Sequence, residues 1–110
     1  MSDTSTAVKE VFAAMPENFN PQAATGMDAV IQYELSGDAE AQYHATIKDG
    51  TCTVAEGAHD APTLTLKMAA SDFVDLINGR LDGMSAFMSG KLRIEGDMGI
   101  AMKLQSLFRA

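Results

Sequence analysis

The C-terminal part of the chain combines four methionines with one amide in a short space: Met84, Met88, Met98, Met102 and Gln105. Methionine side chains are flexible and polarisable, so they fill irregular cores or form deformable walls around apolar ligands. An amide in such a wall would orient the polar end of a ligand. This composition indicates either an irregular core or a cavity that binds an apolar molecule.

Residues suited to metal binding or proton transfer are few. His44, His59 and Cys52 are the only histidines and cysteine, and no pair of them has the spacing of a zinc site. Asp72 and Asp75 fall on the polar side of a predicted helix, where carboxylates are solvated. The sequence contains no glycine-rich phosphate loop and no nucleophile elbow. We therefore expect no metal, no cofactor and no catalytic residues.

Length and charge restrict the remaining classes. A chain of 110 residues is expected to form a single domain, residues 1–110. Its net charge of −7, with Lys and Arg dispersed, disfavours nucleic acid as a partner and allows at most transient contact with anionic membranes. With one cysteine, no leader-like N-terminus and no long apolar run, we expect a cytoplasmic protein.

Apolar periodicity predicts alternating groups of helices and strands. Helices are expected over 8–15, ended by Pro16, over 20–25, 71–78 and 84–90, and from Met98 to about Phe108 after an Asp97 N-cap. Strands are expected over 27–35, 43–48, 63–68 and 91–95, and from Thr51 onward. Together they predict an α+β fold, with a mostly antiparallel sheet that is polar on one face and covered by helices on the other.

The Asp49-Gly50 pair predicts a two-residue hairpin turn, because both positions favour positive φ. In that register Lys48 faces Thr51 and Ile47 faces Cys52. Apolar residues then meet on one face of the sheet, as a half-buried hairpin requires. We therefore expect Cys52 in the core.

The terminal helix carries more apolar surface than one packing face needs. At 100° per residue its apolar positions sweep an arc of roughly 220°, whereas a surface helix needs little more than about 100°. Gln105 falls inside that arc, near Ala101, Met98 and Met102. Either the helix is sandwiched between the sheet and other helices, or one edge of the arc faces a cavity.

The stretch SAFMSGKLRIEGDMGIAMKLQSLF (85–108) resembles the C-terminal signature of the sterol carrier protein 2 family. The signature combines Ala-Phe-Met-x-Gly-Lys-Leu, Ile-x-Gly-Asp-Met-Gly and a helix reading Ala-Met-Lys-Leu-Gln. Upstream, KDGTCTV and APTLTLKMAASDFVDLINGRLD are similar to the family's hairpin, fourth strand and following helix. The resemblance extends from about Phe12 to Phe108.

The resemblance implies a five-stranded mixed sheet covered by helices around an apolar tunnel. It also implies non-catalytic binding of fatty acids, acyl-CoAs, sterols or similar lipids. The C-terminal helix of the family borders the tunnel. Carried over by position, the tunnel-lining candidates are Phe73, Ile77, Met84, Phe87, Met88, Met98, Met102 and Gln105. Because the sequence ends at Ala110 without a peroxisomal signal, a free-standing, bacterial-type member is expected.

Three classes of function fit these patterns. The first is a lipid carrier, and the second is an accessory subunit that presents a lipid to a partner enzyme. The third is a small enzyme acting on an apolar substrate, which would need a paired acid and base among the inward residues. The inferred inward set contains no carboxylate and no histidine, which favours the two binding classes.

Overall fold

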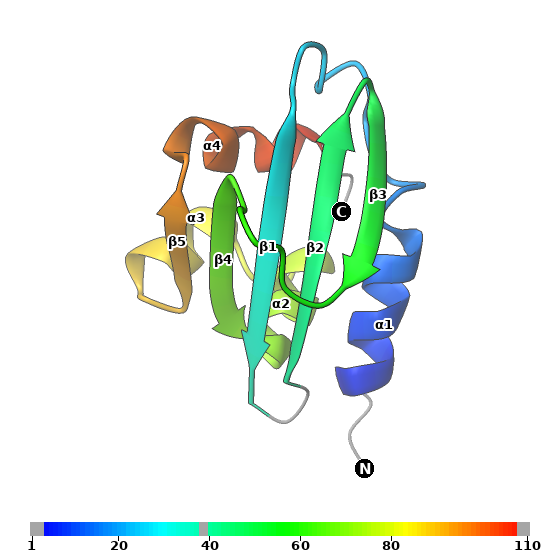
Figure 1. Cartoon of the computed structure of the whole chain (residues 1–110). Helices are drawn as coiled ribbons and strands as arrows, with labels where there is room; N and C mark the ends of the chain where they lie inside the picture. The colour runs from blue at the N-terminus through cyan, green and yellow to red at the C-terminus, as the bar shows by residue number, and fades with distance from the viewer. Residues whose placement is uncertain (1–3, 38–39, 108–110) are drawn as a thin grey trace.

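The computed structural model of the chain describes residues 4–37 and 40–107, with the side chains of all except residues 5 and 104–107. A five-stranded mixed sheet, in the order β3-β2-β1-β4-β5, carries the helices on one face (Figure 1). The elements follow in the order α1 (Thr4–Ala14), β1 (Ala29–Ser36), β2 (Ala41–Lys48), β3 (Thr51–Glu56), β4 (Leu64–Ala69), α2 (Ala70–Ile77), α3 (Gly83–Met88), β5 (Leu92–Gly96) and α4 (Met98–Leu107). The predicted α+β class is confirmed.

The hairpin between β2 and β3 has the predicted register. Asp49 and Gly50 both have positive φ, 54° and 75°, so the two-residue turn forms as the sequence indicates. Lys48 pairs with Thr51 and Ile47 with Cys52. The alternation of the hairpin therefore places Cys52 in the core, where its side chain is buried.

One parallel pair makes the sheet mixed. β1 pairs with β2 antiparallel and with β4 parallel, so β3 and β4 lie on opposite sides of β1. The connection over residues 57–63 consequently crosses the face of the sheet that carries no helices (Figure 1). It is attached to β1 at its end, where the Thr63 backbone N–H donates to the Val30 carbonyl at 2.8 Å.

The core is centred on four aromatic rings, one each from α1, α2, β1 and β2. The Phe12 ring stacks on Tyr43 and on Phe73, with centroids 4.0 and 5.2 Å away, and meets Tyr33 edge-on at 5.2 Å. These contacts join α1, β1, β2 and α2. Tyr33 on β1 is buried, and Tyr43 on β2 is half-buried.

The helix predicted over 20–25 is wrong. Residues 21–26 form successive turns instead, in which backbone N–H groups donate to carbonyls three residues earlier, as from Ala23 to Asn20 and from Ala24 to Pro21. The Asn20 side chain also accepts from the Gln22 backbone N–H at 3.1 Å. An asparagine whose side chain bonds the backbone two residues further on favours turns over a helix.

Candidate functional site

Most of the candidate residues lie on α3 and α4, the two helices that flank β5. Asp82 begins α3, because its carboxylate accepts from the Ser85 backbone N–H at 2.9 Å. Asp97 does the same for α4, accepting from the Ile100 backbone N–H at 3.2 Å. α3 packs against β5, and α4 packs against β4 and β5. We call the part of the molecule formed by residues 83–103, namely α3, β5 and the described start of α4, the β5 edge.

The β5 edge carries every exposed large apolar side chain in the described part of the chain. The exposed fractions are 60% for Met84, 42% for Phe87, 79% for Met88, 45% for Met98 and 77% for Met102. On α4, by contrast, Ile100 and Ala101 pack against the core. The apolar arc of α4 is thus wider than the face it uses for packing, as its helical periodicity indicates, and its surplus side is open.

The remaining candidates lie elsewhere. Phe73 is a core residue on α2, buried between the Phe12 and Tyr33 rings. Ile77, at the end of α2, is half-buried against the core. The side chain of Gln105 lies outside the described residues. The structure therefore brings five of the eight candidates to one edge and separates Phe73 from them.

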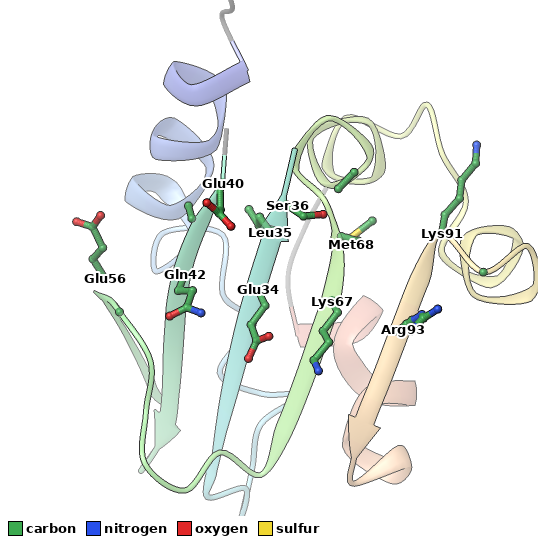
Figure 2. Close-up of a pocket in the computed structure, with 14 residues that line it drawn as sticks. Glu34, Leu35, Ser36, Glu40, Gln42, Glu56, Lys67, Met68, Lys91 and Arg93 are labelled. Carbon is green, nitrogen blue, oxygen red and sulfur yellow. The ribbon is translucent and has the colours of Figure 1, made fainter. Parts of the chain in front are cut away.

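A polar hollow of about 670 Å³ lies on the opposite face of the sheet (Figure 2). Basic residues line its β4–β5 side and acidic residues line its β1–β3 side: Lys67, Lys91 and Arg93 against Glu34, Glu40 and Glu56. Lys67 also forms an ion pair with Glu95 at 3.3 Å. Alternation along the strands predicts this polar face but not its charge segregation, which depends on strand order. Its charged lining does not suit an apolar ligand.

A buried amide fastens the crossing connection to this face. Gln32 is 2% exposed, and its amide nitrogen donates to the carbonyls of Tyr43 and Gly57 at 3.1 and 3.3 Å. Its amide oxygen accepts from the His59 backbone N–H at 2.8 Å. All of its polar atoms are satisfied by backbone, so we assign Gln32 a structural role. Sequence patterning places Gln32 on the outward face but does not show that a loop covers it.

The two histidines lie together: His44 is on β2, and His59 belongs to the connection. Their rings meet edge-on at 5.3 Å, and His44 Nδ1 is 3.0 Å from the Gly57 carbonyl. His59 Nδ1 accepts from the Ala61 backbone N–H at 3.0 Å, and the residue is half-buried. Within residues 4–37 and 40–107, no three His, Cys, Asp or Glu side chains come together in a metal-binding arrangement.

Burial keeps two other reactive groups neutral. It raises the pKa of the Cys52 thiol to about 11, and it raises the pKa of the Tyr33 hydroxyl well above its ordinary value. A thiolate is the nucleophilic form of cysteine, so Cys52 is inert near neutral pH. Both residues therefore belong to the core rather than to a reactive site.

No helix in the described residues is both long and apolar enough to cross a bilayer.

Sequence comparison relates the chain to a known family. The model of the SCP-2 sterol transfer family matches residues 8–109. Hydroxysteroid dehydrogenase-like protein 2 of Xenopus tropicalis is 32% identical over 107 residues, which are 96% of this chain and 26% of that protein. The chain spans about a quarter or less of the length of the curated relatives it matches.

Solved structures share the fold described above. The sterol carrier protein domain 2 of Helicoverpa armigera superposes with a TM-score of 0.77 at 27% identity, and the match covers 96% of this chain and 88% of that one. The palmitated SCP2L2 of Aedes aegypti superposes with a TM-score of 0.70 at 23% identity, covering 94% and 91% of the two chains. The family model matches nearly the whole of this chain, and the fold agrees with that of the solved sterol carrier protein domain, so the chain belongs to the SCP-2 sterol transfer family.

Proposed function

We propose that the chain is a non-catalytic lipid carrier that acts in the cytoplasm and binds fatty acids, acyl-CoAs, sterols or similar molecules at the β5 edge. The observation that supports this most is the gathering of all described exposed large apolar side chains on α3 and α4. Soluble proteins rarely leave such groups in water unless something covers them. Family membership makes a lipid the natural occupant, and a solved neighbour from Aedes aegypti is described as palmitated.

In this proposal the ligand's hydrocarbon part lies between α3, α4 and the sheet. Met84, Phe87, Met88, Met98 and Met102 would wrap the chain, and Ile77 would close the inner end of the tunnel. Fully covering one such side chain stabilises the complex by about 1.5–3 kcal/mol, so a few of them suffice for binding. Phe73 would touch the ligand only if its ring left Phe12 and Tyr33, so we give it a supporting role.

The ligand's polar end needs a hydrogen-bonding partner, and Gln105 is our candidate. It falls on the apolar arc of α4, next to Met102 on the helical wheel. A head-group hydrogen bond contributes about 0.5–1.5 kcal/mol. Gln105→Leu should therefore weaken binding of a fatty acid by roughly three- to ten-fold and leave the melting temperature unchanged or higher. Met102→Glu should weaken binding further, because it places a desolvated charge against the lipid chain.

Fluorescent fatty-acid titration of the wild type and these two variants tests the proposal. Thr53→Glu is the matched control, since it adds the same charge at an exposed position on β3, the far edge strand. The titration is paired with native mass spectrometry and organic extraction of freshly purified protein. Retained lipid and a loss of affinity confined to the two α4 variants would support the proposal. A protein that neither retains nor binds any lipid would refute it.

A second candidate function is an accessory subunit that presents a lipid to a partner enzyme. It is favoured by one observation: the relatives named hydroxysteroid dehydrogenase-like protein 2 are about four times as long as the match, so there this domain is one part of a larger protein. The two functions separate on purification. A carrier retains lipid when purified alone, whereas an accessory subunit co-purifies with an enzyme.

A further inference from the structure

The charge of the molecule is distributed unevenly along the chain. Ten of the fifteen acidic residues but only two of the eight basic residues precede residue 63, so residues 1–62 carry a net charge of −8 and residues 63–110 carry +1. The first group forms α1 and β1 to β3, and the second forms β4, β5 and the other helices. The strands of the first group, β3, β2 and β1, form one side of the sheet, and those of the second group, β4 and β5, form the other (Figure 1). The net negative charge of the chain therefore comes from residues 1–62 and not from the part that contains the β5 edge.

Unpaired positive charge accompanies the exposed apolar side chains. Lys91, Arg93 and Lys103 are exposed, and none of them forms an ion pair within the part of the chain that the structure describes. Lys91 follows α3 by three residues, and Arg93 projects from β5 (Figure 2). Lys91 lies next to α3, where its backbone N–H donates to the Ala86 carbonyl at 2.9 Å, and Arg93 lies on the hollow-lining face of β5. The β5 edge thus combines free cations on and before its strand with exposed Met and Phe side chains on its helices.

The carboxylates of the same region are already engaged. Asp82 and Asp97 accept backbone N–H groups at the starts of α3 and α4, and Glu95 is paired with Lys67. Like-charge repulsion from the acidic half is weak there. β3 lies four strand spacings from β5, about 19 Å, and the Debye length is about 8 Å at physiological ionic strength.

We propose that the β5 edge docks on the surface of a bilayer containing anionic phospholipids. Met84, Phe87 and Met88 enter the interfacial layer, and Lys91 and Arg93 contact the phosphate groups. The docking itself does not depend on the proposed function. Only its purpose, to collect or deliver a lipid at the membrane, rests on that function. It also reconciles membrane contact with a net charge of −7, because the acidic half faces away from the membrane.

A single engineered tryptophan can report the docking, because the natural chain contains none. We expect the emission of Phe87→Trp to shift to the blue with vesicles of phosphatidylcholine and phosphatidylglycerol, and to shift much less with phosphatidylcholine alone. Thr53→Trp, on the opposite edge strand, should not shift with either. Raising the salt concentration should release the protein, since it screens the attraction.

Charge substitutions locate the contact. Lys91→Gln combined with Arg93→Gln should lower partitioning into the anionic vesicles by roughly 30-fold, at about five-fold for each basic residue. Lys9→Gln combined with Lys48→Gln makes the same change in net charge on α1 and at the β2–β3 turn. This control pair should partition like the wild type, whereas equal losses in both pairs would refute a specific docking surface.

Two further results would overturn the proposal. One is the absence of vesicle binding in a protein that binds fatty acid normally in vesicle-free solution. The other is a blue shift of Phe87→Trp without vesicles that grows with protein concentration, which would show that a second copy covers this edge. If instead vesicle binding follows the pattern above and fatty-acid titration fails, the docking stands and the proposed lipid-binding function falls.

Discussion

At the residue scale, Cys52 shows how the register of the β2–β3 hairpin determines which substitutions destabilise the protein. Its side chain faces the core opposite Ile47, so Cys52→Asp would bury an unpaired charge. We expect a loss of about 3–5 kcal/mol in the free energy of unfolding. Cys52→Ala should cost far less, and Thr53→Asp, one residue on and exposed, less than about 1 kcal/mol. Urea denaturation measures all three; equal stability of Cys52→Asp and Thr53→Asp would show that the face assignment is wrong.

The raised pKa of the same thiol predicts a loss of stability in alkali. Its pKa is about 11 in the folded protein, against 9.0 ordinarily, so the unfolded chain releases this proton first as the pH rises. The stabilisation is complete below pH 9 and is lost between about pH 9 and 11, by roughly 2–3 kcal/mol. Cys52→Ala should reduce this slope and leave the part due to Tyr33, whose pKa is also raised. An unchanged slope in Cys52→Ala would contradict the prediction.

Individual residues also show what the sequence could predict. Asp49-Gly50 and the alternation beside it determine the register of β2 and β3, because turn geometry and burial agree locally. The apolar arc of α4 predicts surplus apolar surface, which the exposure of Met98 and Met102 confirms. Periodicity does not say which neighbour covers a face, however, so it could not place Phe73 in the aromatic cluster or His59 against His44. Such placements depend on strand order and loop path, which are long-range properties.

At the element scale, the crossing connection over 57–63 depends on Gln32. Gln32→Leu would leave the His59 N–H without its partner and would remove one of the two side-chain nitrogens at the Gly57 carbonyl, at a cost of about 1–3 kcal/mol. We also expect faster hydrogen exchange at the His59 amide, since the connection would open locally. Gln42→Leu replaces the same side chain at an exposed position on β2 and should change neither quantity. Undiminished protection of His59 in Gln32→Leu would show that other contacts hold the connection.

A second element-scale prediction concerns Gly96, the last residue of β5. Its φ is +112°, and an added Cβ would collide with the Thr63 carbonyl, to which the Asp97 N–H also donates at 3.1 Å. Gly57 has nearly the same φ, +109°, with open space around it. Gly57→Ala therefore measures backbone strain alone, about 1–3 kcal/mol. Gly96→Ala should be less stable than Gly57→Ala by a further 1 kcal/mol or more, as measured by thermal unfolding, and equal losses would refute the close approach.

At the scale of the whole molecule, the proposed ligand surface is built mainly from methionine. Methionine repacks easily and apolar contacts are non-directional, so we expect several lipids of similar size to bind with affinities within about ten-fold. Competition binding with fatty acids of different chain lengths measures this range. Acceptance of one length with rejection of its neighbours by about 100-fold would instead indicate a rigid, shaped pocket.

The parallel pairing of β1 with β4 at the centre of the sheet also influences the order of folding. The β2–β3 hairpin closes over two residues, which takes about 1–10 μs in isolated hairpins. The central seam instead joins Val30 to Thr63, 33 residues apart, and must wait for a much larger loop to close. Until then the β4-facing side of β1 presents unpaired backbone N–H and C=O groups, the kind of strand edge on which chains aggregate. The strand best protected in the finished protein is thus the one most vulnerable while the chain is folding.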